Sequence, residues 1–146
     1  MASDDIEAIR ALVHEYAERL DEGDLDGVAS LFADATWGSP GRGTPLRGVE
    51  QVRRAYEDVI LYGGKPGTKH VISNVTIELG ADAATATARS YFTVLQARPG
   101  FPLQPIISGR YHDRFERVDG HWRFADRQIL PDLVGELSQH LRHARL

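Results

Sequence analysis

The chain has 146 residues, of which 42% are hydrophobic and 26% charged, and its formal net charge is −4. A chain of this size and composition can bury its own core, so we expect one globular domain over residues 1–146. The absence of cysteine excludes a disulfide scaffold, a cysteine-based zinc site and a thiol nucleophile. The acidic balance argues against nucleic acid as a partner, and no apolar run is long enough to cross a membrane. The acidic start, which lacks a signal-peptide pattern, predicts a cytoplasmic location.

The first part of the chain has the periodicity of helices. Apolar residues recur at helical spacing over Asp4–Leu20, and Asp4 is a candidate side-chain cap for that segment. Asp21 follows on the flank of the apolar stripe, so its carboxylate can face whatever the helix covers. Two further helical segments are expected, over Leu25–Phe32 and Gly48–Leu61.

After residue 68 the apolar period changes to two, which is typical of strands. The expected strands are Lys69–Leu79, Thr85–Ala97, Ile106–Val118 and His121–Leu130. The proline-rich stretch Arg98–Pro105 is expected to be an irregular connection, and residues 131–146 a C-terminal helix, over Asp132–Ala144, or a tail. Helices followed by an antiparallel meander predict an α+β fold, with helices on a strongly curved sheet that encloses a pocket.

Several motifs resemble the SnoaL-like branch of the NTF2-like superfamily. They are Leu20-Asp21-Glu-Gly-Asp24, Leu31-Phe32-Ala-Asp34-Ala-Thr-Trp37, His70-Val-Ile-Ser-Asn74, Gly109-Arg-Tyr111-His-Asp113-Arg-Phe115 and Asp119-Gly120-His-Trp122-Arg-Phe124. Their order and spacing over residues 4–130 carry the resemblance. It implies a cone-shaped domain that binds a small hydrophobic molecule without cofactor or metal, and that assembles as a homodimer or homotrimer.

Within this group the chain looks most like scytalone dehydratase, the bile-acid 7α-dehydratases and the lindane dehydrochlorinase. These enzymes remove a proton with an Asp–His dyad, and the corresponding residues here are Asp21 and His70. An imidazole can accept a proton near neutral pH, and a carboxylate on its other nitrogen would fix the tautomer and stabilise the imidazolium. The alternative is a helix-end charge and a structural histidine, because contact between the two cannot be derived from their spacing.

The same resemblance suggests aromatic residues that would bind the substrate. Tyr16 lies inside the apolar stripe, where its phenol either donates a hydrogen bond to a substrate oxygen or simply packs in the core. Trp37 matches a pocket tryptophan of the dehydrochlorinase. Tyr56 and Tyr111 are further candidates for the pocket lining.

Two polar residues on the later strands are also candidates for substrate binding. His112 either takes the part of a second site histidine or lies on the surface, on the face opposite Tyr111. Arg127 either neutralises an anionic substrate or pairs with Asp126 or Asp113. The remaining histidines, which we expect to be exposed, are His14, His121, His140 and His143.

These expectations favour a cofactor-free dehydratase or isomerase that acts on a small, largely apolar cyclic substrate, with His70 as the general base. One alternative is a polyketide cyclase or an epoxide hydrolase on the same fold. The epoxide hydrolases of this fold use an Asp-Arg-Asp constellation, and here His112 stands where the second acidic group would be expected. Another alternative is a cone that binds a ligand without catalysis.

Overall fold

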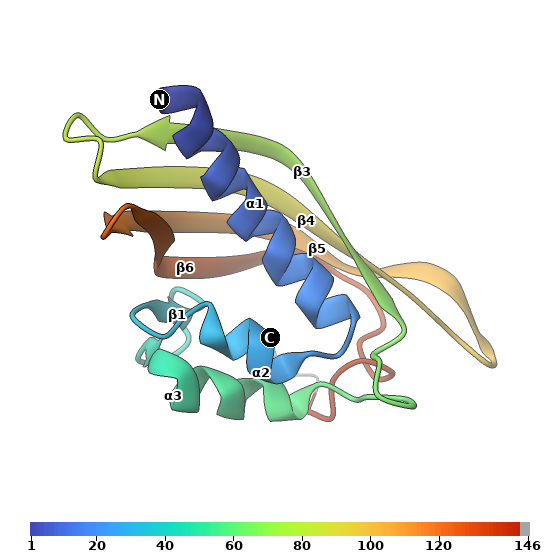
Figure 1. Cartoon of the computed structure of the whole chain (residues 1–146). Coiled ribbons are helices and arrows are strands. Elements are labelled where there is room, and N and C mark those ends of the chain that lie inside the picture. The colour runs from blue at the N-terminus through green and yellow to red at the C-terminus, as the bar shows by residue number, and fades with distance from the viewer. Residues whose placement is uncertain (144–146) are drawn as a thin grey trace.

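The computed structural model describes residues 1–143 and consists of helices packed against one face of a six-stranded sheet (Figure 1). The strand order is β2-β1-β6-β5-β4-β3, and all neighbours are antiparallel except the parallel pair β1 and β6. The strands are β1 (Thr36–Gly38), β2 (Leu46–Arg47), β3 (Thr68–Leu79), β4 (Thr85–Arg98), β5 (Phe101–Val118) and β6 (His121–Val134). The predicted α+β class is therefore confirmed.

The helices lie on the side toward which the sheet curves (Figure 1). They are α1 (Ala2–Asp21), α2 (Leu25–Ser30) and α3 (Gly48–Ala55), and a 3-10 turn, η1 (Tyr56–Asp58), follows α3. The apolar stripe of α1 is buried through Ile9, Val13 and Leu20, which meet the inward-facing residues of the sheet. In the part of the chain that the structure describes, no helix is long and apolar enough to cross a membrane.

Bulges give the sheet its curvature. The β3–β4 ladder shifts register between Ser73 and Thr76, and Asn74 has a φ of 53° there. The β4–β5 and β5–β6 ladders each shift twice. Because an extra residue in one strand bends that strand and increases its twist, these shifts curve the sheet around α1.

Helix boundaries differ from the sequence prediction in all three helices, and α2 ends at Ser30 rather than Phe32. α1 begins at Ala2, so Asp4 lies in its first turn and does not cap it. The third helix ends at Ala55 rather than Leu61, because the chain becomes extended after η1. There the backbone N–H of Ile60 donates to the carbonyl of His140 at 2.8 Å, a bond that a continuing helix could not make.

All four long strands extend beyond their predicted bounds, β5 and β6 the most. The stretch Arg98–Pro105 is not irregular, since β4 and β5 continue to a tight turn at residues 99–100. Pro105 is tolerated inside β5 because it lies at a register shift, where proline does not break the ladder. β6 runs on to Val134, so the predicted helix over Asp132–Ala144 is wrong for its described residues, which form strand end and tail, while Ala144 lies outside them.

Exposed apolar side chains gather on the face of the sheet that points away from α1. Val71, Tyr91 and Leu133 are all exposed. They share one face, because the ladders align Val71 with Thr93, Thr93 with Ser108 and Ser108 with Leu133. Assembly as a homodimer or homotrimer stays a prediction.

A buried ion pair joins the two central strands beneath the cavity described below. Arg127 of β6 faces Asp113 of β5, and two hydrogen bonds of 2.8 Å join the guanidinium to the carboxylate. The guanidinium carbon also lies 3.8 Å from the ring centre of Tyr111 and 4.3 Å from that of Tyr16. Burial works to lower the pKa of Arg127, but the charge and hydrogen bonds of Asp113, together with Tyr111 and Tyr16, outweigh it and raise the pKa. The arginine therefore stays charged and supports both rings.

We expect Arg127→Met to lower the free energy of unfolding by about 3–5 kcal/mol, because it leaves the Asp113 carboxylate buried without a partner. The double variant Arg127→Met/Asp113→Leu should recover much of this loss. Urea unfolding followed by circular dichroism measures both. Arg110→Met is the control, since the ion pair of Arg110 with Asp132 is half-exposed and worth less than about 1 kcal/mol. Equal destabilisation by the two single variants would contradict the assignment.

Candidate functional site

Asp21 and His70 are in contact. Asp21 is the last residue of α1, and His70 is the third residue of β3. Oδ1 of Asp21 lies 2.6 Å from Nδ1 of His70, while Oδ2 accepts the backbone N–H of the same histidine at 2.8 Å. The hydroxyl of Thr68 also donates to Oδ1, at 2.8 Å. The side chain of His70 is only 4% exposed and that of Asp21 13%, so little water competes for these bonds.

The charge of Asp21 sets the tautomer of His70. Burial works to raise the pKa of Asp21, but the hydrogen bonds and charge of His70, with the hydrogen bond from Thr68, lower it overall. Asp21 is then a carboxylate at neutral pH and can only accept, so Nδ1 of His70 must carry the hydrogen. The other nitrogen of the neutral ring, Nε2, holds a free electron pair, and no residue within 1–143 donates a hydrogen bond to it.

His70 borders a cavity of about 260 Å³ between α1, the sheet and the C-terminal tail. Its wall is mainly apolar and includes Leu20, Phe92, Val94, Ile107, Ile129 and Leu137. A space of this size and lining suits a small ring compound that presents few polar groups. The arrangement therefore places His70, an imidazole with one unbonded nitrogen, among the residues that line an apolar cavity.

Four of the predicted aromatic residues line this cavity together with His70. The hydroxyls of Tyr16 and Tyr56 are hydrogen-bonded to each other, and the indole of Trp37 lies 5.5 Å from the Tyr56 ring. Tyr111 stacks on Phe92, with ring centres 4.5 Å apart. Burial raises the pKa of Tyr56 and of Tyr111 well above the ordinary range, so both phenols keep their protons at neutral pH. Protonated phenols can donate hydrogen bonds to a substrate oxygen.

Two predicted substrate-binding residues lie outside the cavity. His112 projects from the outer face of the sheet, since side chains alternate along β5 and its neighbour Tyr111 points inward. Arg127 is fully buried and its charge is used by Asp113. The structure therefore brings neither residue to the cavity, and each follows its stated alternative: His112 lies on the outer face, and Arg127 pairs with Asp113.

His140, expected on the surface, lies inside the site. The residue is only 6% exposed and borders the cavity, and its ring centre is 6.4 Å from that of His70. Burial, together with the nearby charge of His70, lowers the pKa of His140 to about 4. Sequence reasoning missed this residue because no local pattern places the tail over the cavity.

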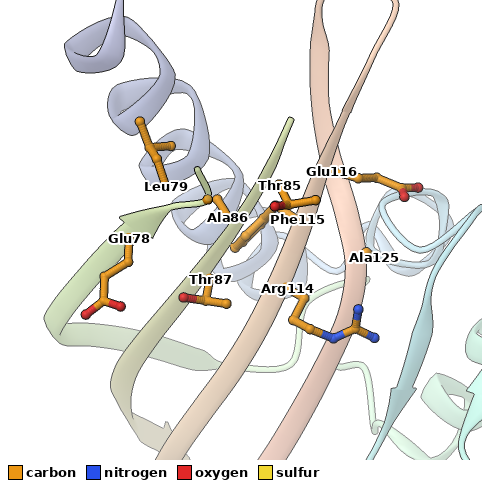
Figure 2. A pocket seen from close by; sticks show the side chains of 10 residues that line it. Glu78, Leu79, Thr85, Ala86, Thr87, Arg114, Phe115, Glu116 and Ala125 are labelled. Atoms are coloured by element: carbon orange, nitrogen blue, oxygen red, sulfur yellow. The ribbon is translucent and has the colours of Figure 1, made fainter. Parts of the chain in front are cut away.

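A second hollow lies at the far end of the sheet, away from the dyad. Figure 2 shows the side chains of Glu78, Thr87, Arg114 and Glu116 around it, three of which are charged. It contains neither of the dyad residues. Within residues 1–143, no group of three or more histidine or acidic side chains could hold a metal ion.

The depressed pKa of His140 makes the protein sensitive to mild acid. The unfolded chain binds a proton at this ring below about pH 6.5, whereas the folded protein does so only below about pH 4. The unfolded state therefore holds more protons in this window, and stability falls as pH falls, by roughly 1 kcal/mol per unit. The groups that face the ring are His70, Asp21 and Asp58.

We expect the free energy of unfolding to fall between pH 7 and pH 5, and to fall less in His140→Phe. Urea titrations at both pH values measure this difference. His14→Gln removes a histidine from the exposed side of α1 and should keep the wild-type dependence. Identical pH dependence in the wild type and His140→Phe would contradict the prediction.

Comparison with known proteins identifies the family. Residues 1–128 match the SnoaL-like domain family, while a search among proteins of curated function finds no match. A protein of unknown function from Mycobacterium tuberculosis has a similar structure, with 26% identity, a TM-score of 0.74, and coverage of 91% of this chain and 75% of that one.

Two structures from Novosphingobium aromaticivorans have the same fold. One is an NTF2-like protein with a cystatin-like fold (22% identity, TM-score 0.69, 88% of this chain and 82% of that one). The other is a candidate scytalone dehydratase (23% identity, TM-score 0.71, 90% of this chain and 87% of that one). The chain belongs to the SnoaL-like domain family and has its NTF2-like fold.

Proposed function

We propose that this protein is a cofactor-free enzyme of the dehydratase or isomerase type, which removes a proton from carbon in a small, largely apolar cyclic substrate. The observation that carries the proposal is the Asp21–His70 dyad, whose histidine belongs to the wall of an apolar cavity. The similar structure of a candidate scytalone dehydratase supports it only at the level of fold.

In the proposed reaction, Nε2 of His70 takes a proton from a substrate carbon next to a carbonyl group. The electron pair of the broken C–H bond moves toward that carbonyl, and a phenol of Tyr16 or Tyr56 hydrogen-bonds the oxygen where negative charge gathers. Asp21 stabilises the imidazolium that forms. The proton then returns to another ring carbon in an isomerisation, or leaves with a hydroxyl group as water in a dehydration.

The epoxide-hydrolase alternative finds less support in the geometry. An Asp-Arg pair exists, Asp113 and Arg127, but both side chains are fully buried and neither borders the cavity. A pair sealed behind Tyr16 and Tyr111 cannot activate water against a ligand in the cavity. A ligand-binding role without catalysis is left as an outcome of the experiments below.

The tautomer of His70 tests the dyad without a substrate. At a pH where the ring is neutral, we expect ¹⁵N NMR to show hydrogen on Nδ1 and none on Nε2, because the Asp21 carboxylate accepts from Nδ1. In Asp21→Asn this preference should weaken, since an amide oxygen is a poorer acceptor and carries no charge. A preference for hydrogen on Nε2 in the wild type would contradict the assigned base.

Proton abstraction can be measured before the natural substrate is known. We expect the wild type to catalyse exchange of deuterium from D₂O into a cyclic ketone such as 2-indanone, followed by ¹H NMR. His70→Gln should slow the protein-dependent exchange by about 10²-fold or more, which is typical of losing a general base, and Asp21→Asn should also slow it.

His112→Gln is the matched control, because it removes a histidine from the outer face of the sheet and should leave the exchange rate unchanged. Exchange that is equally fast in His70→Gln would contradict the proposed base. Binding of cyclic ketones with no protein-dependent exchange across a panel of them would favour the ligand-binding alternative.

A further inference from the structure

The C-terminal tail is held over the cavity by backbone hydrogen bonds. The carbonyl of His140 accepts from the N–H of Ile60 at 2.8 Å, and the N–H of Arg142 donates to the carbonyl of Asp58 at 2.8 Å. Residues Val59 and Leu141 form a β-bridge between these two bonds. The tail therefore pairs with the extended segment after η1 much as a short strand would.

Side chains hold the same segment from the other direction. The carbonyl of Gln139 accepts from the hydroxyl of Tyr62 at 2.6 Å and from the buried amide of Gln96 at 3.0 Å. Gln96 lies on β4, so its bond ties the tail to the sheet as well as to the helical side. Contacts on both sides give the backbone at position 140 a defined place, and the direction of its side chain is defined with it.

That position carries the imidazole of His140 to the wall of the cavity, beside His70. Its Nδ1 is shielded from solvent, and no donor or acceptor within residues 1–143 reaches it. A buried nitrogen without a partner costs free energy, and a structural histidine in a core is normally bonded. Nε2, the other nitrogen of the ring, also makes no hydrogen bond within residues 1–143, and it is accessible where Nδ1 is not, so Nε2 is the atom that a ligand in the cavity beside the ring would bond.

We propose that His140 is a substrate-binding residue, which hydrogen-bonds a hydroxyl group of the cyclic substrate held beside His70. This inference rests on the proposed function and narrows its substrate class to hydroxyl-bearing ring compounds. A hydroxyl group suits the site because it both donates and accepts, so it satisfies either tautomer of a neutral imidazole. A carboxylate suits the His140 ring less, since Asp21 and Asp58 place negative charge near it, while Arg42 is the positive charge that borders the same cavity.

The low pKa of His140 agrees with this role. A ring that is neutral at pH 7 adds no positive charge beside His70, so it does not oppose the imidazolium that forms there when the base takes up a proton. It can still bind a neutral hydroxyl group. The two histidines therefore have different tasks, set by their surroundings: His70 has a carboxylate partner, and the His140 ring has none among the described residues.

The inference is tested with two ring compounds of nearly the same shape, indan-5-ol and indane, whose binding is measured by NMR titration. The wild type should bind indan-5-ol about fivefold to tenfold more tightly than indane, the usual effect of one hydrogen bond. His140→Phe should abolish this preference while retaining affinity for indane. His140→Asn, which keeps a donor and an acceptor, should restore part of it.

The control is His112→Phe, the same substitution on the outer face of the sheet, which should keep the wild-type preference. In the wild type the ¹⁵N signals of the His140 ring should also shift with indan-5-ol and not with indane, a readout that needs no variant to fold. If the preference for indan-5-ol over indane persists in His140→Phe, or is lost only in His70→Gln, the inference about His140 is overturned. The proposed function is not affected by that result. Failure of both compounds to bind the wild type would instead contradict the cavity as a ligand site, and with it the proposed function.

Discussion

The carboxylate of Asp21 joins the two halves of this fold and orders the site at the same time. It ends α1 and accepts three hydrogen bonds from the start of β3, two from His70 and one from the hydroxyl of Thr68. These bonds fix where the covering helix meets the sheet, and thereby the width of the space between them. The same bonds hold the imidazole of His70 in one orientation and one tautomer. Architecture and chemistry therefore depend on a single side chain.

The charged groups lie at two depths, one pair below the cavity and another beside it. Arg127 and Asp113 neutralise each other below the cavity, where the guanidinium lies against the rings of Tyr16 and Tyr111. The phenols of Tyr56 and Tyr111 stay protonated because burial disfavours their anions. The cavity is thus left with a carboxylate and an imidazole in contact, and the charged side chains of Arg42 and Asp58 also border it. In a medium of low dielectric constant, a dyad of this kind interacts more strongly with charge that develops on a bound molecule.

Much of this arrangement could be predicted from local patterns. The apolar periodicity located α1 and the long strands, and it placed Asp21 at the end of a helix that covers the sheet. Contact between Asp21 and His70 could not be derived from periodicity, because it depends on how α1 crosses the sheet. The alternation of side chains along β5 puts His112 on the face opposite Tyr111. A strict use of this rule predicts that His112 lies outside the site.

The errors lie where tertiary contacts override local signals. Prolines suggested an irregular link before Ile106, yet a bulge at Pro105 accommodates one of them inside β5. The sequence predicts a helix or a tail after residue 131. The backbone groups of this segment bond to residues 58–62 and to Gln96, which are distant in sequence. His140 reaches the cavity only through those long-range bonds, so no sequence pattern near position 140 predicts that it borders the cavity. The helices and sheet of this fold follow local rules, whereas the wall of the cavity is completed by a tail whose path is set by long-range hydrogen bonds.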